Sequence, residues 1–523
     1  MMELIDNKQV KIVVPIDVAK VIQEHIEKVE VLKTEKNLVH LLIHWGIAEM
    51  IQLNQLCLFK NPLPSPITKD YKWTGRFHPF DHQKVTSEFL SIQSRAFCFN
   101  EAGTGKTSSV LWACDYLMNM GIIKRVLIIC PLSIMTSAWK NDIYNTCVHR
   151  VPGEAYGTAD DRRLIINNPR YEFVIINYDG VAIVKDDIDK ANFDLIVVDE
   201  ANAYKSVTTT RWKTLNKLVK PTTKLWMLTG TPAAQSPVDA YGLARLVCPY
   251  RVPKFSTAWR DIVMYQISRF KWLPRNGSEH KVFNTLQPAI RFAKEDCLDL
   301  PDIVYQTRIV PLSKSAEKFY QELKKEFLIE AAGQEISSVN AAANMTKLLQ
   351  ISGGAVYTDD KKVVEFDISP RLKELHEVID QTSHKLLVFV PYRHTILIVA
   401  EYLTKIGVTN SVINGSVSKA ERTTIIKEFQ NAEDPRVLVI QPQSASHGVT
   451  LTRADTVVFW SPVMSVETYV QCIARIQRVG QKNNMTIIHL QGSEIEKRMY
   501  GMLQQKVTAH TSLVDLYREE IGI

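Results

Sequence analysis

The chain has 523 residues, of which 46% are hydrophobic and 23% charged, and its formal net charge is +7. This composition excludes a disordered or fibrous protein, and the length exceeds what a single hydrophobic core usually serves, so about three domains are expected. The mild basic excess is compatible with a polyanionic partner but does not require one.

The eight cysteines are scattered singly along the chain, with no C-x-x-C pair among them. Neither a zinc site nor a disulfide framework is therefore expected. The N-terminus lacks a basic-then-apolar signal, and no apolar run reaches the length that a bilayer requires. We therefore expect a soluble, intracellular protein with no membrane partner.

The first 60 residues form an N-terminal region of unknown role, with helical patterns over residues 18–33 and 38–53. The second pattern fits a partner-binding face or, more simply, part of a small buried core. A Pro-rich connector at residues 61–66 separates this region from the rest of the chain.

Short apolar runs rich in β-branched residues then recur, each followed by polar or helical sequence. This alternation predicts an α/β fold with two tandem parallel-sheet domains, over residues 61–250 and 371–523, the second ending in helices. Residues 251–370 contain helical stretches over 313–332 and 337–352 and are interpreted as a helical insert and linker. The predicted strands are 95–99, 126–130, 173–177, 195–199, 225–228, 386–390, 408–413, 437–440, 456–460 and 486–490.

A glycine-rich segment, N-E-A-G-T-G-K-T at residues 100–107, lies between a predicted strand and a predicted helix. Its glycines let backbone N–H groups wrap a phosphate, Lys106 would neutralise the β- and γ-phosphates, and the Thr107 hydroxyl would bind Mg²⁺. Asn100 occupies the place of a glycine in the strict pattern. The alternative is a glycine turn with an incidental lysine. The expected nucleotide-binding residues here are Ala102, Gly103, Thr104, Gly105, Lys106, Thr107 and Ser108.

Two adjacent carboxylates, Asp199 and Glu200, follow the apolar strand at residues 195–199. Because ligands of α/β sheets collect at the carboxyl ends of strands, Asp199 is predicted to hold Mg²⁺ through water and Glu200 to polarise the attacking water. The alternative is a polar strand end.

Thr229 and Thr231, after the next strand, could contact these carboxylates and relay nucleotide state. Upstream, Gln83 has the two-sided amide needed to read an adenine edge.

The run Q-C-I-A-R-I-Q-R-V-G-Q at residues 471–481 places Gln471, Arg475 and Arg478 on one face of a predicted helix. Two guanidinium groups beside a glutamine suit the charge that develops on a transferring phosphoryl group. The alternative is a solvated basic helix face.

In this order, the motifs resemble those of superfamily-two helicases, specifically the Swi/Snf-type double-stranded DNA translocases. The likeness covers about residues 77–491, and the compact size is similar to phage-encoded members. Three departures occur: Asn202 replaces the usual histidine, Asn100 replaces a small residue, and residues 446–448 carry one glycine where the family often has two. The further segments that carry the resemblance are 127–133 with Trp139, 198–201, 228–232 and 450–458.

The resemblance implies two RecA-like domains that sandwich ATP with Mg²⁺, which Thr107 and Asp199 would hold. The catalytic residues it implies are Lys106, Glu200, Gln471, Arg475 and Arg478. The residues that the resemblance implies for coupling between the domains are Thr229, Thr231 and Gly448. The implied candidates for nucleic-acid contacts are Ser133, Thr136 and Arg393, although helix capping explains the two hydroxyls equally well.

The expected function is that of an ATP-dependent DNA translocase or helicase acting on duplex or branched DNA. Replication or recombination proteins are candidates for further partners, and a phage-encoded member would work in the host cytoplasm. Two alternatives remain: an ATP-dependent RNA helicase, and a nucleotide-gated nucleic-acid-binding module without translocation.

Overall fold

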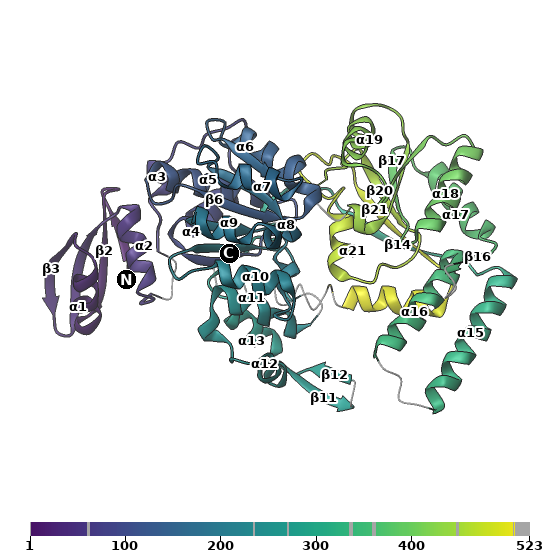
Figure 1. Cartoon of the computed structure of the whole chain (residues 1–523), viewed down its shortest axis with the longest axis horizontal. Coiled ribbons are helices and arrows are strands. Elements are labelled where there is room, and N and C mark those ends of the chain that lie inside the picture. Colours follow the sequence, from purple (N-terminus) through teal and green to yellow (C-terminus); the bar gives the residue numbers. More distant parts are fainter. Residues whose placement is uncertain are drawn as a thin grey trace.

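The computed structural model describes residues 2–59, 63–233, 236–268, 271–333, 338–357, 362–445, 449–505 and 507. A small N-terminal unit, a first α/β domain and a second α/β domain follow one another along the longest axis (Figure 1). Within these residues, no helix combines the length and apolar character needed to cross a bilayer.

The N-terminal unit is an antiparallel sheet of order β1-β2-β4-β3 packed against helices. The helical patterns predicted over residues 18–33 and 38–53 are each confirmed for only about half of their length, because residues 29–33 and 38–44 lie in strands. Val39, Leu41 and Ile43 are buried while their neighbours are more exposed, which is the period of two of a half-buried strand. The elements are β1 (Met2–Ile5), β2 (Gln9–Pro15), α1 (Ile16–His25), β3 (Val29–Glu35), β4 (Leu38–His44) and α2 (Ile47–Gln55).

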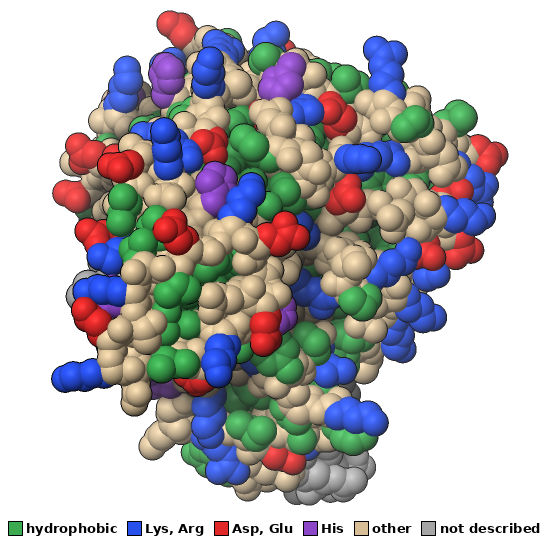
Figure 2. Space-filling model, turned by 90° about the vertical axis from the view of Figure 1, so that its left-hand side faces the viewer, with side chains coloured by type: hydrophobic (Ala, Val, Ile, Leu, Met, Phe, Trp, Pro, Cys, Tyr) green, Lys and Arg blue, Asp and Glu red, His purple; other side chains and the backbone are tan. Residues whose placement is uncertain are grey.

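Charges of both signs are interspersed on the surface at this end of the molecule, and no single-sign patch dominates it (Figure 2). The exposed ion pairs of the sheet, such as Lys33 with Glu35 and Lys11 with Glu3, are local. They contribute little to stability because water screens them.

The first α/β domain is built on a seven-stranded parallel sheet of order β13-β5-β10-β9-β6-β8-β7. All five strands predicted here are confirmed, while β7 and β13 were missed because they are short and lack a β-branched run. The strands are β5 (Arg95–Cys98), β6 (Val126–Cys130), β7 (Pro152–Ala155), β8 (Phe173–Asn177), β9 (Leu195–Val198), β10 (Lys224–Leu228) and β13 (Ala289–Ile290).

Helices cover both faces of this sheet, so alternate strand residues enter two separate cores. Cys98 packs in one core and Phe97 in the other, as the strand period requires. The helices are α3 (Ile67–Asp70), α4 (Asp81–Ile92), α5 (Lys106–Asn119), α6 (Asn141–Thr146), α7 (Ala159–Ile166), α8 (Tyr178–Ile183), α9 (Lys185–Ala191), α10 (Thr210–Leu218), α11 (Ala240–Val247), α12 (Ser256–Val263), α13 (Ser278–Thr285) and α14 (Lys294–Cys297). Short 3₁₀ turns span Leu132–Ile134, Ala201–Tyr204, Pro237–Asp239 and Pro249–Arg251, and a π turn spans Met135–Lys140.

The second α/β domain has a six-stranded parallel sheet of order β14-β21-β20-β17-β19-β18. Its five predicted strands are confirmed, and two cores again lie on the two faces. The strands are β14 (Ile303–Ile309), β17 (Lys385–Phe389), β18 (Asn410–Ile413), β19 (Val437–Ile440), β20 (Ala454–Phe459) and β21 (Met485–Gln491). The helices are α15 (Lys314–Gly333), α16 (Ser338–Gly353), α17 (Ser369–Gln381), α18 (Arg393–Lys405), α19 (Lys419–Asn431), α20 (Pro442–Ala445) and α21 (Val466–Ile473).

The segment expected to be a helical insert and linker contains α15 and α16, but it also supplies a strand to each sheet. β13 pairs with β5 in the first sheet, and β14 pairs with β21 in the second. Two small antiparallel ladders lie in the same segment, β11 (Met264–Ser268) with β12 (Lys271–Pro274) and β15 (Ala355–Tyr357) with β16 (Val363–Glu365). Residues 251–370 therefore contribute one strand to each sheet besides their helices, and the domain boundaries at residues 250 and 370 stay predictions.

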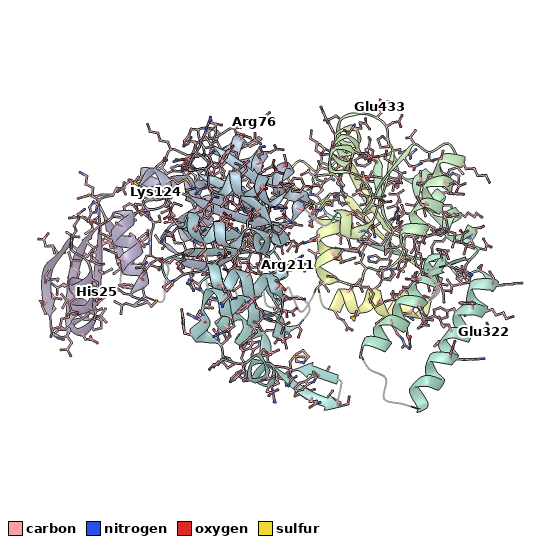
Figure 3. All side chains as sticks on the ribbon, in the orientation of Figure 1. His25, Arg76, Lys124, Arg211, Glu322 and Glu433 are labelled. Carbon is pink, nitrogen blue, oxygen red and sulfur yellow. The ribbon has the colours of Figure 1, made fainter. Side chains whose placement is uncertain are left out.

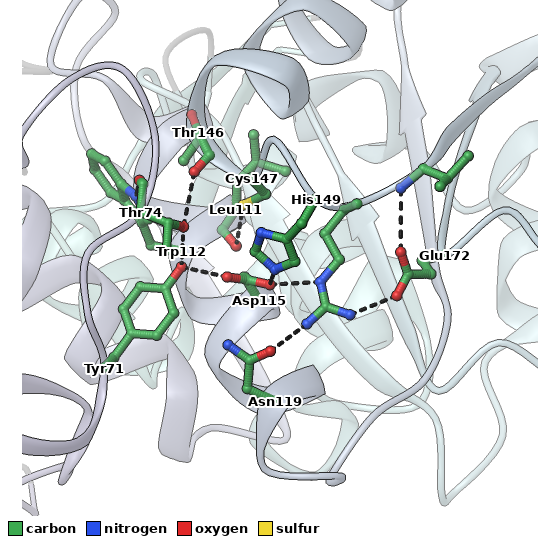
Figure 4. A network of polar contacts seen from close by, with 12 residues as sticks. Tyr71, Thr74, Leu111, Trp112, Asp115, Asn119, Thr146, Cys147, His149 and Glu172 are labelled. Atoms are coloured by element: carbon green, nitrogen blue, oxygen red, sulfur yellow. Dashed lines mark hydrogen bonds and ion pairs between the residues drawn. The ribbon is translucent and has the colours of Figure 1, made fainter.

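A buried polar network fastens Tyr71, the residue that follows α3, to α5 (Figure 4). The Asp115 carboxylate is fully buried and accepts hydrogen bonds from Tyr71 Oη at 2.6 Å, His149 Nε2 at 3.0 Å and Arg150 Nε at 2.6 Å. Arg150 continues the network through an ion pair with Glu172. Since α5 begins at the glycine-rich loop, this network anchors the helix that carries Lys106.

Asp115→Ala should lower the free energy of unfolding of the first domain by about 3 kcal/mol, because it leaves the buried Tyr71 phenol without its acceptor and removes one carboxylate from the partly buried Arg150 guanidinium. Urea denaturation of the full chain, followed by tryptophan fluorescence, measures the change. Asp160→Asn is the matched control, since Asp160 pairs with Arg163 on the exposed surface. A loss no larger than that of the control would contradict a structural role for the network.

Candidate functional site

The glycine-rich loop lies between β5 and α5, in the strand-loop-helix context that was predicted. Gly103 and Gly105 have φ of +98° and +78°, in the left-handed region where a side chain is strained. At Gly105 a Cβ would also lie 1.9 Å from Gln83 Nε2. Asn100, the departure from the strict pattern, is buried and donates to Thr86 Oγ1 at 2.8 Å. Its side chain therefore ties the loop to α4.

Gln83 packs directly against this loop. Its Oε1 accepts from the Phe80 backbone N–H at 3.0 Å, and its Nε2 donates to the Thr104 carbonyl at 3.2 Å. His82 Nε2 makes a second hydrogen bond to the same carbonyl at 2.8 Å. Gln83 thus holds the loop, and its reading of an adenine edge stays a prediction.

Asp199 and Glu200 are held at the end of β9 among buried groups. Asp199 Oδ2 accepts from Trp139 Nε1 at 2.9 Å, and Tyr178 Oη donates to the Asp199 carbonyl at 2.7 Å. Burial raises the pKa of Asp199, while burial and the neighbouring Asp199 charge raise the pKa of Glu200 to about 8. Glu200 also has φ of +47°, a strained conformation for a residue with a side chain. Two such carboxylates need a nearby cation, and the Lys106 charge lowers the pKa of both.

The turn after β10 contacts the carboxylate segment through Asn202. Asn202 Nδ2 lies 3.0 Å from the Thr231 carbonyl and 3.1 Å from Thr231 Oγ1, and Thr229 Oγ1 accepts from the Thr231 N–H at 3.2 Å. Burial raises the pKa of Glu467, on α21 of the second domain, and a hydrogen bond from Asn202 lowers it. The asparagine that replaces the usual histidine therefore joins the carboxylate segment to the Thr231 turn and to the second domain.

The arginine run of the second domain is not one helix. α21 ends at Ile473, and Arg475 Nε donates to the Gln471 carbonyl at 2.7 Å while its Nη1 donates to the Val449 carbonyl at 3.0 Å. The predicted single helix is therefore wrong, because the Arg475 side chain caps the helix end. Gln471 and Arg475 are buried, and Arg478 is partly buried. A solvated basic face is thereby excluded.

The two domains meet at the glycine-rich loop. A Cβ on Gly103 would lie 3.2 Å from Arg478 Cγ, and Arg478 Nη1 donates to Thr450 Oγ1 at 3.0 Å. Burial and the Arg478 charge lower the pKa of Arg475 to about 10, while the Glu200 charge raises it. The arginines that follow α21 thus lie close to the loop and the carboxylates of the first domain.

A cavity of about 580 Å³ opens at this meeting point. Thr107 and Ser108 occupy the first turn of α5. The sequence-predicted residues that line the cavity are Ala102, Lys106, Glu200, Thr231 and Gln471.

A second cavity of about 850 Å³ separates the two domains and contains the predicted hydroxyls. Ser133 and Thr136 line it from the first domain, and Thr136 Oγ1 donates to Glu154. Arg211, which faces the second domain in Figure 3, lines it as well.

Arg393 is exposed at the start of α18 and is not among the lining residues. Gly448 lies outside the described residues.

Sequence reasoning missed two buried cations, Arg291 and Lys294, which the structure places beside the glycine-rich loop. Both stand in the largely apolar run A-I-R-F-A-K at residues 289–294. Because arginine and lysine are rarely buried without a partner, their place in that run was the available signal.

Comparisons with known proteins agree with this geometry. The chain matches the SNF2-related domain over residues 82–360 and the helicase conserved C-terminal domain over residues 370–480. It is 26% identical to the protein p41 of Acyrthosiphon pisum secondary endosymbiont phage 1 over 444 residues, which cover 79% of this chain and 92% of p41.

Longer relatives match as well. The human DNA annealing helicase and endonuclease ZRANB3 is 24% identical over 83% of this chain and 40% of its own length. The SWI/SNF-related matrix-associated actin-dependent regulator of chromatin subfamily A-like protein 1 of Xenopus laevis is 23% identical over 84% and 44% respectively. The chain thus spans less than half of each.

Among solved structures, a SWI2/SNF2 ATPase core of Sulfolobus solfataricus in complex with dsDNA is similar, with 19% identity and a TM-score of 0.40. The aligned region covers 86% of this chain and 97% of that one. The SNF2-related match alone extends over more than half of the present chain. The protein therefore belongs to the SNF2-related family of superfamily-two helicases and is an ATP-hydrolysing enzyme with two tandem RecA-like domains.

Proposed function

We propose that this enzyme couples ATP hydrolysis to movement along duplex or branched DNA. The observation that carries the proposal is the cavity between the two sheets, where the glycine-rich loop, the carboxylates and the arginine run converge. A nucleotide in that cavity touches both domains, so its state sets the spacing between them.

In the proposed mechanism, the loop N–H groups and Lys106 bind the phosphates of ATP. Glu200 accepts a proton from a water molecule whose oxygen attacks the γ-phosphorus, and the bond to the β–γ bridging oxygen breaks to release ADP. Arg475 and Arg478 stabilise the charge that develops on the transferring phosphoryl group. Lys106 and these arginines come from different domains, so hydrolysis requires the domains to be closed.

Thr107 and Asp199 supply the oxygen donors that we propose for Mg²⁺. Within the described residues, no group of three or more His, Cys, Asp or Glu side chains is arranged to hold a metal ion. Mg²⁺ suits such a site because it is usually bound by one or two protein oxygens, with phosphate and water completing its shell. When bound, it would neutralise phosphate charge beside the buried carboxylates.

We propose that the DNA backbone contacts the residues that line the second cavity between the domains. Arg211 and Ser133 from the first domain and Arg422 and Ser444 from the second line it. Arg422 Nε is buried and has no hydrogen-bond partner, which leaves a donor for an anionic ligand. Hydroxyls and guanidinium groups bind the phosphate backbone without reading sequence. ZRANB3, a relative, bears the name of a DNA annealing helicase, which supports DNA as the polymer.

Glu200→Gln should retain ATP binding and lower the hydrolysis rate by about 10² or more, because the amide keeps the shape of the side chain but cannot accept the proton. Fluorescent-nucleotide titration and steady-state phosphate release measure the two properties. Glu421→Gln is the control, since Glu421 is exposed on α19. Wild-type turnover in Glu200→Gln would remove this residue from the mechanism.

Arg478→Ala should lower the hydrolysis rate by about 10³, while nucleotide affinity changes only modestly, because the guanidinium acts on charge that develops in the transition state. The same two assays apply. Arg498→Ala, at an exposed arginine near the C-terminal end of the described chain, is the matched control. Unchanged hydrolysis would assign Arg478 to a structural contact with Thr450.

Duplex or forked DNA should stimulate ATP hydrolysis, and the enzyme should displace the third strand of a triplex in an ATP-dependent reaction. Binding should weaken steeply with salt, because the contacts are to phosphates. ATPase assays with single-stranded, duplex, forked and four-way DNA, and with RNA, test the substrate. Stimulation by RNA alone would support an RNA helicase, and DNA-dependent hydrolysis without triplex displacement would support a nucleotide-gated binding module.

A further inference from the structure

The chain crosses from the first sheet to the second beside the nucleotide cavity. β13 pairs with β5 at the edge of the first sheet, and β14 pairs with β21 at the edge of the second. Only residues 291–302 lie between these two strands, and we call them the crossing segment. Glu295, Leu298 and Asp302 of this segment line the 580 Å³ cavity. The only described peptide path between the two sheets therefore forms one wall of that cavity.

Arg291 fixes the start of the crossing segment. Its side chain is fully buried, and its Nη1 donates to the carbonyls of Phe99 and Gly230. Its Nη2 forms an ion pair with Glu101 at 2.8 Å. A single guanidinium therefore joins the glycine-rich loop, the turn after β10 and the crossing segment into one unit.

Lys294 extends from this anchored start into the space between the domains. Its backbone N–H donates to Glu101 Oε2 at 3.2 Å, and its Nζ donates to Gln477 Oε1 of the second domain at 2.8 Å. Its Cε lies 3.8 Å from the position that a Cβ on Gly103 would occupy. The ammonium thus reaches the same part of the loop as Arg478.

The charge around Lys294 is incompletely balanced within the protein. Burial lowers the pKa of Lys294 to about 8, and the Glu101 charge opposes this shift, whereas Lys106, Arg475 and Arg478 add to it. Glu101 is already paired with Arg291, and the direct partner of the ammonium is a neutral amide. A buried cation in such surroundings is stabilised by an anion, and a triphosphate supplies one.

We propose that Lys294 binds the terminal phosphate of ATP in exchange for the Gln477 amide, so that the crossing segment detects whether the γ-phosphate is present. The proposal rests on the nucleotide site described above but requires no DNA. ADP lacks the phosphate that Lys294 binds, so with ADP the ammonium returns to Gln477. The segment between the sheets is then held by the nucleotide in one state and by the second domain in the other.

The first test is the affinity of the full chain for the Mg²⁺ complexes of AMP-PNP and ADP, measured with a fluorescent competitor and without DNA. Lys294→Met should weaken AMP-PNP binding about tenfold or more and ADP binding by no more than about twofold, because a charge-assisted contact to phosphate is lost. Lys294→Arg should preserve most of the discrimination. Lys497→Met, at an exposed lysine, is the matched control.

Gln477→Ala separates phosphate binding from a simple tie between domains. If Lys294 binds the phosphate, removing its competing amide leaves AMP-PNP affinity equal to wild type or higher. If Lys294 acts only through Gln477, the variant loses affinity as Lys294→Met does, which overturns the proposal. Equal losses for AMP-PNP and ADP in Lys294→Met would overturn it too.

Hydrogen exchange of residues 291–302 is a readout independent of affinity. AMP-PNP, but not ADP, should slow exchange of this segment in the wild type, and saturating AMP-PNP should fail to do so in Lys294→Met. Identical protection in the variant would overturn the proposal while leaving the proposed function intact. Failure of the wild type to bind either nucleotide would instead overturn the nucleotide site, and with it both proposals.

Discussion

Incompletely compensated buried charge is the constraint on which the functional arrangement depends. The first domain buries Asp199 and Glu200 side by side, and burial and mutual repulsion raise the pKa of Glu200. The second domain buries Arg475, whose pKa burial lowers and the Glu200 charge raises. Charges taken out of water require opposite charges nearby. Neither the two carboxylates nor Arg475 is well compensated by charges of its own domain. The closed arrangement and the proposed complex of ATP with Mg²⁺ would therefore stabilise the same groups.

The two asparagine departures are understandable from the contacts they make. Asn100 replaces a small loop residue, yet it is buried and hydrogen-bonds Thr86 and the Phe292 N–H, so it joins the loop to α4 and to the crossing segment. Asn202 replaces a histidine and keeps a hydrogen bond to Thr231. Because an amide cannot carry charge, this hydrogen bond to the turn after β10 does not depend on the ionisation of residue 202.

Periodicity sufficed for the long β-branched strands and for the strand-loop-helix that contains Lys106, because local pattern and burial agree there. Periodicity failed where contacts between distant parts of the chain determine whether a strand forms or where a helix ends. The two-residue strand β13 exists because β5 offers a free edge, and α21 stops at Ile473 because the Arg475 side chain caps it. The N-terminal run at residues 38–44 alternates in burial, but its apolar density also fits a helix. Arg291 and Lys294 carry no familiar motif, so only the fold reveals their neighbours.

Because the crossing segment is short, it constrains changes in the spacing of the two domains. The first residue of the segment, Arg291, is fixed by its side-chain hydrogen bonds. The pairing of β14 with β21 holds the chain from residue 303 onward. A change in the spacing of the domains must therefore be absorbed within about a dozen residues that also line the nucleotide cavity. A connection placed elsewhere could open and close without contacting the nucleotide. In the proposed arrangement, closure, phosphate contact and the path of the chain depend on the same side chains, so a change in any one of them displaces the other two.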